Sequence, residues 1–139
     1  MIDIVKIRID GGTQSRVEIN NDVVSDYAEA LKGDVQLPPV DVFFDGAEYW
    51  LVDGFHRYHA HRSVGVANIE ANIHNGTLRD AQLFSFGVNA SHGLRRSNAD
   101  KRKAVEFMLN DAEWSAWSNN EIAKRCSVSL DLVNRLRSS

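Results

Sequence analysis

The first third of the chain spaces its apolar and polar residues in a way that predicts a strand followed by a helix. Between residues 2 and 9 the two kinds alternate over most of the stretch, with the period of two that is typical of a half-buried strand. Residues 22–31 space their apolar side chains as an amphipathic helix does. Gly33 is expected to end that helix.

The middle of the chain predicts a hairpin and then a second helix. Apolar runs at residues 40–44 and 48–52 flank the turn residues Asp45 and Gly46. A connection this short makes the two strands antiparallel neighbours. Residues 55–64 then have the pattern of a helix that ends at a glycine.

Strand character continues for one more segment and then ends. Residues 69–73 predict a strand, and residues 77–85 predict a helix for which Thr77 is the N-cap. From Asn98 onward the pattern predicts helices alone. The order of elements is therefore a mixed α/β body followed by an all-helical segment.

Charge divides the chain in a similar place. Residues 1–90 hold 7 Lys and Arg against 13 Asp and Glu, whereas residues 91–139 hold 9 against 6. A basic C-terminal part is compatible with nucleic acid, although a solvated helical surface carries a similar excess. We therefore expect an α+β protein, with a small mixed-sheet domain over residues 1–90 and an all-helical segment over residues 91–139.

Composition narrows the class further. A chain of 139 residues with 43% apolar and 25% charged residues is ordinary for a globular protein. The single cysteine, Cys126, excludes an internal disulfide framework and a cysteine-based zinc site. No apolar run approaches the length that spans a membrane, and the first residues do not form a signal-peptide core. We expect a cytoplasmic protein without a membrane partner.

The turn after the second hairpin strand carries the groups of an anion site. Gly54 lets the backbone turn tightly, and His56 and Arg57 then fall in the first turn of the next helix. Backbone amides, an imidazole and a guanidinium at one place suit phosphate oxygens. On spacing alone, a plain connection between strand and helix that happens to carry polar residues is equally open.

The last two predicted helices have the pattern of a helix-turn-helix. Ser118 can cap the first helix, with Glu121 in position to complete a capping box, and Ser129 can cap the second. The second helix is expected to bury its apolar stripe and to turn its polar side chains outward. An ordinary helical hairpin is the alternative. The residues that we expect to contact DNA are Ser129, Asp131, Asn134, Arg135 and Arg137.

Read in order, four motifs resemble the ParB/sulfiredoxin superfamily. They are Gln14-Ser15-Arg16, the stretch from Asp53 to Ala60, the stretch from Asn89 to Arg96, and the helix-turn-helix. The resemblance covers nearly the whole chain. It implies a ParB/sulfiredoxin-like domain that binds a nucleoside triphosphate, CTP being the usual ligand of chromosome-segregation ParB proteins, coupled to a segment that binds double-stranded DNA.

The resemblance also implies roles for single residues. Asn89 would help to hold a metal such as Mg²⁺. Phe55 and Val88 stand where ParB proteins carry glutamates, which should weaken metal-assisted hydrolysis unless Asp53 or water substitutes. Phe55 also replaces the catalytic cysteine of sulfiredoxins, so reductase activity is not expected. The residues expected at the nucleotide from the motifs are Gln14, Arg16, Gly54, Phe55, His56 and Arg57.

A third basic cluster precedes the helix that starts near Asn98. His92, Arg95 and Arg96 could close over a triphosphate or reach DNA phosphates, and a solvated connection is the alternative.

Together these features predict a ParB-like DNA-binding protein, either a partition-type factor or a transcriptional regulator, whose N-terminal domain binds CTP or another nucleoside triphosphate as a switch. A metal-dependent nuclease or NTPase is the alternative, with Asp53, His56 and His92 as candidate ligands. A regulatory domain that has lost its ligand is a third possibility. The chain stops soon after the second helix of the helix-turn-helix. One such motif contacts only half of a symmetric DNA site, so we expect a homodimer or a longer parent protein.

Overall fold

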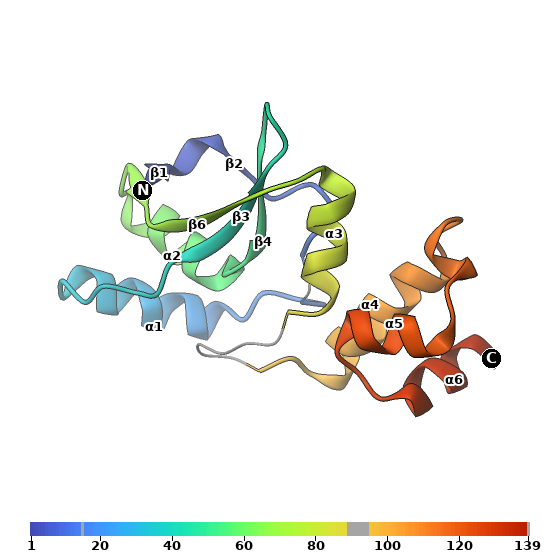
Figure 1. The fold of residues 1–139 in the computed structure, drawn as a ribbon. Helices are drawn as coiled ribbons and strands as arrows, with labels where there is room; N and C mark the ends of the chain where they lie inside the picture. Colours follow the sequence, from blue (N-terminus) through green and yellow to red (C-terminus); the bar gives the residue numbers. More distant parts are fainter. Residues whose placement is uncertain (15, 89–94, 139) are drawn as a thin grey trace. The chain divides into compact units, whose positions relative to one another are not determined.

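The computed structural model describes residues 1–14, 16–88 and 95–138, which divide into two compact units. The α/β unit comprises Met1–Gln14 and Glu18–Gln82, and the helical unit comprises Ser15–Val17 and Leu83–Ser139. The division falls inside a helix, whereas the sequence predicts a domain boundary after residue 90. The predicted α+β class is confirmed (Figure 1).

A mixed sheet of four strands, in the order β2-β4-β3-β6, forms the centre of the α/β unit. β3 and β4 are antiparallel, whereas β2 runs parallel to β4 and β6 runs parallel to β3. β1 and β5 pair with each other as a separate antiparallel ladder. The strands are β1 (Ile2–Asp3), β2 (Ile7–Arg8), β3 (Val40–Phe44), β4 (Tyr49–Asp53), β5 (Asn68–Ile69) and β6 (Ala71–Asn75).

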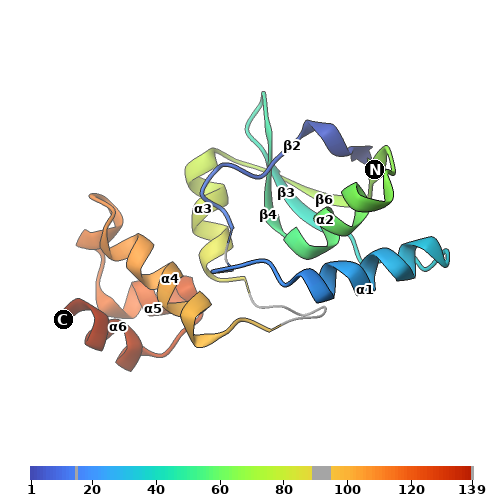
Figure 2. The same cartoon turned by 180° about the vertical axis from the view of Figure 1, so that it is seen from behind.

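Helices cover both faces of this sheet and make up most of the helical unit. α1 packs along α2 in the α/β unit (Figures 1 and 2). The α-helices are α1 (Asn21–Lys32), α2 (Phe55–Val64), α3 (Leu78–Phe86), α4 (Asn98–Leu109), α5 (Asn119–Cys126) and α6 (Leu130–Ser138). Two 3-10 turns, η1 (Ile4–Lys6) and η2 (Trp114–Ala116), complete the described elements.

The predicted hairpin and the first two predicted helices are confirmed. β3 and β4 enclose the turn at residues 45–48, where Asp45 accepts hydrogen bonds from the backbone amides of residues 47 and 48. The Asn20 side chain caps α1 by accepting from two first-turn amides, and Gly33 ends that helix. Gly65 ends α2 with a φ of 86°, as a left-handed C-cap does.

The sequence predicts one strand over residues 2–9 and one over residues 69–73, and both predictions are wrong because each stretch forms more than one element. Residues 2–9 form β1, η1 and β2, because the Asp3 carboxylate accepts from Val5 N at 3.2 Å and Ile4 N donates to Ala67 O at 3.0 Å. Residues 69–73 likewise divide between β5 and β6. Ile69 pairs with β1, and the strand that follows pairs with β3 in the other sheet.

Alternation along β3 and β4 builds two cores in the α/β unit. Val42 and Leu51 point to the face covered by α2, where they pack with Phe55 of that helix. Phe43 and Val52 are in the other cluster, against the first turns of α3. The two inner strands, β3 and β4, therefore pack on both faces of the sheet, and the turn that joins β4 to α2 lies at the end of an inner strand.

The helical unit has its own core. Phe86, Val105, Met108, Trp114 and Ile122 are buried together with residues of α5 and α6. Among the described residues, no helix is long and apolar enough to cross a lipid bilayer.

Candidate functional site

The turn between β4 and α2 can be made by glycine with little strain. Gly54 has φ 94° and ψ 31°, in the left-handed region. A Cβ at this position would lie 2.7 Å from Val40 Cγ1 and 3.0 Å from Arg57 Nη2. Gly54, the N-cap residue, has no side chain that could cap α2. The first-turn amides of α2 point toward this turn, and amides at a helix N-terminus can bind an anion.

Arg57 is buried and bonded to the backbone ahead of β3. Its side chain is 5% exposed, and Nη1 donates to Pro38 O at 2.9 Å and also to Pro39 O. Nη2 lies 3.6 Å from the Asp53 carboxylate, one turn earlier in the chain. The guanidinium therefore holds the approach to β3 and the end of β4 around the glycine turn.

His56 and Phe55 are also used inside the α/β unit. His56 is 7% exposed, and its Nε2 accepts from Asn20 N at 3.0 Å, which ties α2 to the N-cap of α1. Phe55 is part of the core beneath the sheet. The structure thus brings Asp53, Gly54, Phe55, His56 and Arg57 to one turn, as expected. It gives His56 and Arg57 internal partners that the sequence does not reveal.

Arg16 belongs to the helical unit, where Asp100 of α4 binds it. Arg16 Nη1 lies 3.3 Å from Asp100 Oδ2, Val17 N donates to Asp100 Oδ1 at 2.7 Å, and Lys103 Nζ donates to Arg16 O at 2.8 Å. Burial raises the pKa of Asp100, but amide hydrogen bonds from Ser97 and Val17 and the Arg16 charge outweigh it, so the pKa is below its usual value. Asp100 is therefore an ionised anchor for this short segment.

Arg96 is a second buried cation in the helical unit. It is 9% exposed, and its guanidinium donates to Phe86 O at 2.9 Å, Cys126 O at 2.9 Å and Ser127 O at 3.2 Å. Burial lowers its pKa. These bonds join the ends of α3 and α5, which is a structural use of a residue that the sequence predicts at a phosphate. The neighbouring Arg95 is exposed.

The remaining residues predicted at the nucleotide or the metal are Gln14, Asn89 and His92. Gln14 is half-buried in the α/β unit. Asn89 and His92 lie outside the described residues. Among the residues that are described, no group of three or more His, Cys, Asp or Glu side chains could hold a metal ion. The described part of the predicted metal site, Asp53, has the Arg57 guanidinium as its neighbour and does not by itself fit Mg²⁺.

The predicted caps of α5 and α6 are confirmed. Ser118 Oγ accepts from Glu121 N at 3.1 Å, and Ser129 Oγ accepts from Leu132 N at 3.3 Å. The capping box at α5 is not reciprocal, because the Glu121 carboxylate accepts from Arg125 Nε at 2.8 Å. Between the helices, residues 127–129 form the turn, which allows their apolar faces to pack around the core of the unit.

The residues predicted to contact DNA are exposed along α6, but their side chains have different partners. Asp131 pairs with Arg135 at 3.3 Å, and Asn134 Oδ1 accepts from Asn119 Nδ2 at 2.7 Å. Arg137 donates to two backbone carbonyls in the segment before α5, both at 3.0 Å. Arg137 is thus bound to its own unit, whereas Ser129, Asp131 and Arg135 are on the open surface.

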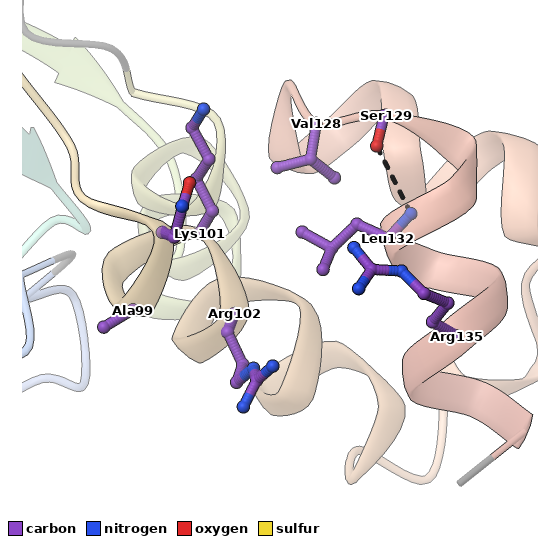
Figure 3. A pocket seen from close by; sticks show the side chains of 8 residues that line it. Ala99, Lys101, Arg102, Val128, Ser129, Leu132 and Arg135 are labelled. Carbon is purple, nitrogen blue, oxygen red and sulfur yellow. Dashed lines mark hydrogen bonds between the residues drawn. The ribbon is translucent and has the colours of Figure 1, made fainter.

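A cleft in the helical unit was not predicted (Figure 3). It has a volume of about 550 Å³ and lies between the first turn of α4 and the start of α6. Of the residues that line this cleft, the sequence predicts a functional role only for Ser129 and Arg135, as DNA contacts. The adjacent basic pair Lys101-Arg102 on a predicted helix was the available signal. The lining residues are Asn98, Ala99, Lys101, Arg102, Val128, Ser129, Leu132 and Arg135.

The chain is similar to a known protein family and to two regulatory proteins. Residues 1–90 match the family model of the ParB N-terminal domain. The chain is 33% identical over 106 residues to the transcriptional regulator NovG of Streptomyces niveus, covering 76% of this chain and 32% of that protein. It is 30% identical over 88 residues to a possible regulatory protein of the streptomycin biosynthesis operon of Streptomyces griseus, covering 63% and 25%. The chain spans about a third or less of these curated relatives.

Solved structures share the fold. Sulfiredoxin from Arabidopsis thaliana aligns with a TM-score of 0.50 and 26% identity, covering 58% of this chain and 91% of that one. C-terminally truncated ParB from Caulobacter crescentus, complexed to the centromeric parS site, aligns with a TM-score of 0.61 and 13% identity, covering 97% and 68%. The same protein complexed with CTP-γ-S gives 0.54 and 14%, covering 97% and 74%. At such identities the ParB alignments show the fold alone.

Proposed function

We propose, because this chain belongs to the ParB N-terminal domain family, that it is the DNA-binding part of a ParB-like transcriptional regulator. The observation that carries the proposal is the pair α5 and α6, which bury Ile122, Ala123 and Val133 and leave polar side chains of α6 exposed. Similarity to two regulatory proteins supports regulation in preference to plasmid partition.

In this proposal α6 enters the major groove of double-stranded DNA. Asn134 and Arg135 carry the amide and guanidinium groups that read adenine and guanine edges. Arg135 first has to leave Asp131, and their side chains are 66% and 80% exposed. Exposed ion pairs contribute at most about 1 kcal/mol, so exchanging this pair for a base contact costs little.

DNA binding can be tested by fluorescence anisotropy at low salt. A duplex selected from a random pool is compared with its scrambled sequence, using the parent chain, Asn134→Ala and, as a control, Asn75→Ala on exposed β6. We expect Asn134→Ala to reduce the preference for the selected duplex by about 1–3 kcal/mol, and the control to keep it. Failure of the parent chain to bind any duplex would contradict the proposal.

For the α/β unit we propose a nucleoside triphosphate as ligand, CTP first, with its phosphates at the Gly54–Arg57 turn. The glycine N-cap of α2 and the family membership support this assignment. The buried Arg57 would support the turn, and His56 would exchange its hydrogen bond from Asn20 for one to a phosphate oxygen. Binding there would favour whichever conformation the ligand contacts best, which is the basis of a switch.

A thermal-shift panel tests this ligand independently of DNA. CTP, ATP, GTP and UTP are compared with and without Mg²⁺ on the parent chain, His56→Gln and the control His59→Gln, which lies on the same helix. A ligand at 100 times its Kd stabilises the folded state by about 2.7 kcal/mol. We expect CTP to raise the melting temperature of the parent and of His59→Gln but not of His56→Gln. The same shift in all three would rule out this site.

A further inference from the structure

The unpredicted cleft of the helical unit combines cationic walls with an apolar floor (Figure 3). Lys101 and Arg102 project from α4, and Arg135 projects from α6 across the opening. Val128 and Leu132 line it with apolar side chains. Within the described part of the chain, no carboxylate lines this space.

The cations of the cleft are available to an anion. Arg102 lies 3.9 Å from Glu106 with side chains 60% and 50% exposed, and Arg135 pairs with Asp131 on a similarly open surface. Pairs this exposed contribute at most about 1 kcal/mol each. Lys101 forms no ion pair with any residue that the structure describes. Phosphate oxygens can therefore replace the present partners at little cost.

The apolar floor distinguishes a sugar–phosphate strand from a simple anion. Free phosphate contacts cations and hydrogen-bond donors only, and it would leave Val128 and Leu132 in water. A DNA strand presents a deoxyribose, whose carbon atoms can cover an apolar surface, between successive phosphates. At about 550 Å³ the cleft also exceeds what one phosphate needs.

We propose that this cleft holds the sugar–phosphate backbone of one DNA strand while α6 occupies the adjacent groove. The proposal rests on the DNA-binding function proposed above and adds the place where the strand is held. Arg135 is exposed on α6 and also lines the cleft, so it connects the strand in the cleft with the helix in the groove. Lys101 and Arg102 would contact phosphates and so strengthen binding without regard to sequence.

The salt dependence of binding tests this assignment. The full chain, the double variant Lys101→Gln/Arg102→Gln and the charge-matched control Lys6→Gln/Lys32→Gln are titrated with a selected and a scrambled duplex across a salt series. Both control lysines are exposed in the α/β unit. Loss of two phosphate contacts should flatten the plot of log K against log salt by about 2, equally for both duplexes. The charge-conserving variant Lys101→Arg/Arg102→Lys should keep the parent slope, and circular dichroism verifies that each variant is folded.

Each outcome decides a different point. No binding by the parent chain overturns both the proposed function and the cleft. Binding by the parent with the same slope in the Gln double variant overturns the cleft alone. If that slope is unchanged but inorganic pyrophosphate raises the melting temperature of the parent and not of the variant, the cleft serves a free anion and the strand assignment is wrong.

Discussion

Replacing Asp100 with asparagine should destabilise the helical unit, because the carboxylate has donors on both oxygens. Oδ1 accepts from Val17 N at 2.7 Å, and Oδ2 accepts from Ser97 N at 2.8 Å and lies 3.3 Å from Arg16 Nη1. The whole residue is 5% exposed. An asparagine has the same shape, but one of its two polar atoms is an amide nitrogen that cannot accept a hydrogen bond.

The size of the loss follows from the groups that are left without a partner. Whichever oxygen becomes nitrogen, at least one backbone donor loses its acceptor, at about 1–3 kcal/mol. The Arg16 guanidinium, with an 11% exposed side chain, also loses its opposing charge. Breaking a buried pair on one side costs about 3–5 kcal/mol. We therefore expect Asp100→Asn to lower the free energy of unfolding by about 3 kcal/mol.

Urea unfolding measures this loss. The indole NMR signals of Trp114 report on the helical unit and those of Trp50 on the α/β unit. With a slope of about 1–3 kcal/mol per molar urea, the Trp114 midpoint should fall by about 1–3 M. The control Glu106→Gln, on the same helix with a side chain that is 50% exposed, should change stability by less than about 1 kcal/mol. A loss as small as that of the control would refute the reasoning.

The pH dependence gives a second check on Asp100. Its pKa in the folded chain is lowered, so its contribution to stability is complete above the unfolded pKa of about 3.9. The contribution disappears as the pH falls through the lower folded value. The stability difference between the parent chain and Asp100→Asn should therefore be constant near neutrality and shrink below about pH 4.

Other substitutions test the remaining packing arguments. Arg96→Met leaves three backbone carbonyls without their donor, so the helical unit should lose about 2–4 kcal/mol in urea unfolding, against less than about 0.5 for exposed Arg95→Met. Gly54→Ala should cost more than Gly46→Ala, although both have positive φ, because a Cβ at Gly46 meets nothing within 4 Å; circular dichroism in urea measures the difference. Burial raises the pKa of the Cys126 thiol to about 12, so iodoacetamide should label it at pH 8 far more slowly in the native than in the unfolded chain, as mass spectrometry would show. Since the unfolded thiol ionises first, native stability should decline above about pH 9.

The sequence predicts correctly those elements whose ends are set by residues nearby in the chain. α1 and α2 begin and end at residues that cap helices in isolation, namely Asn20, Gly33 and Gly65, and the β3–β4 hairpin is set by a short turn. Residues 2–9 and 69–73 each predict one continuous strand. In the structure each stretch is interrupted, because its parts pair with segments that are distant in the sequence. Periodicity along one segment does not contain that information.

The candidate site shows the same limit. Gly54, His56 and Arg57 lie at one turn because they are neighbours in the chain, and their role at a nucleotide stays a prediction. Motif order did not show that Asn20 binds His56, or that Arg16 meets a carboxylate 84 residues away. The cleft combines α4 with α6, and no spacing rule links Lys101 to Arg135. Residues that are close in space but far apart in sequence require the fold.

The segment at residues 15–17, counted in the helical unit although its neighbours on both sides are not, has a consequence for how such proteins diversify. A recombination event that replaced everything after residue 82 would exchange most of the helical unit but leave the old Arg16 and Val17 behind. Asp100 of the incoming piece would then need a compatible pair from its new host. Exchange by a single crossover should therefore succeed mainly between parents that already agree at these three positions, and a library of such chimaeras would reveal the constraint.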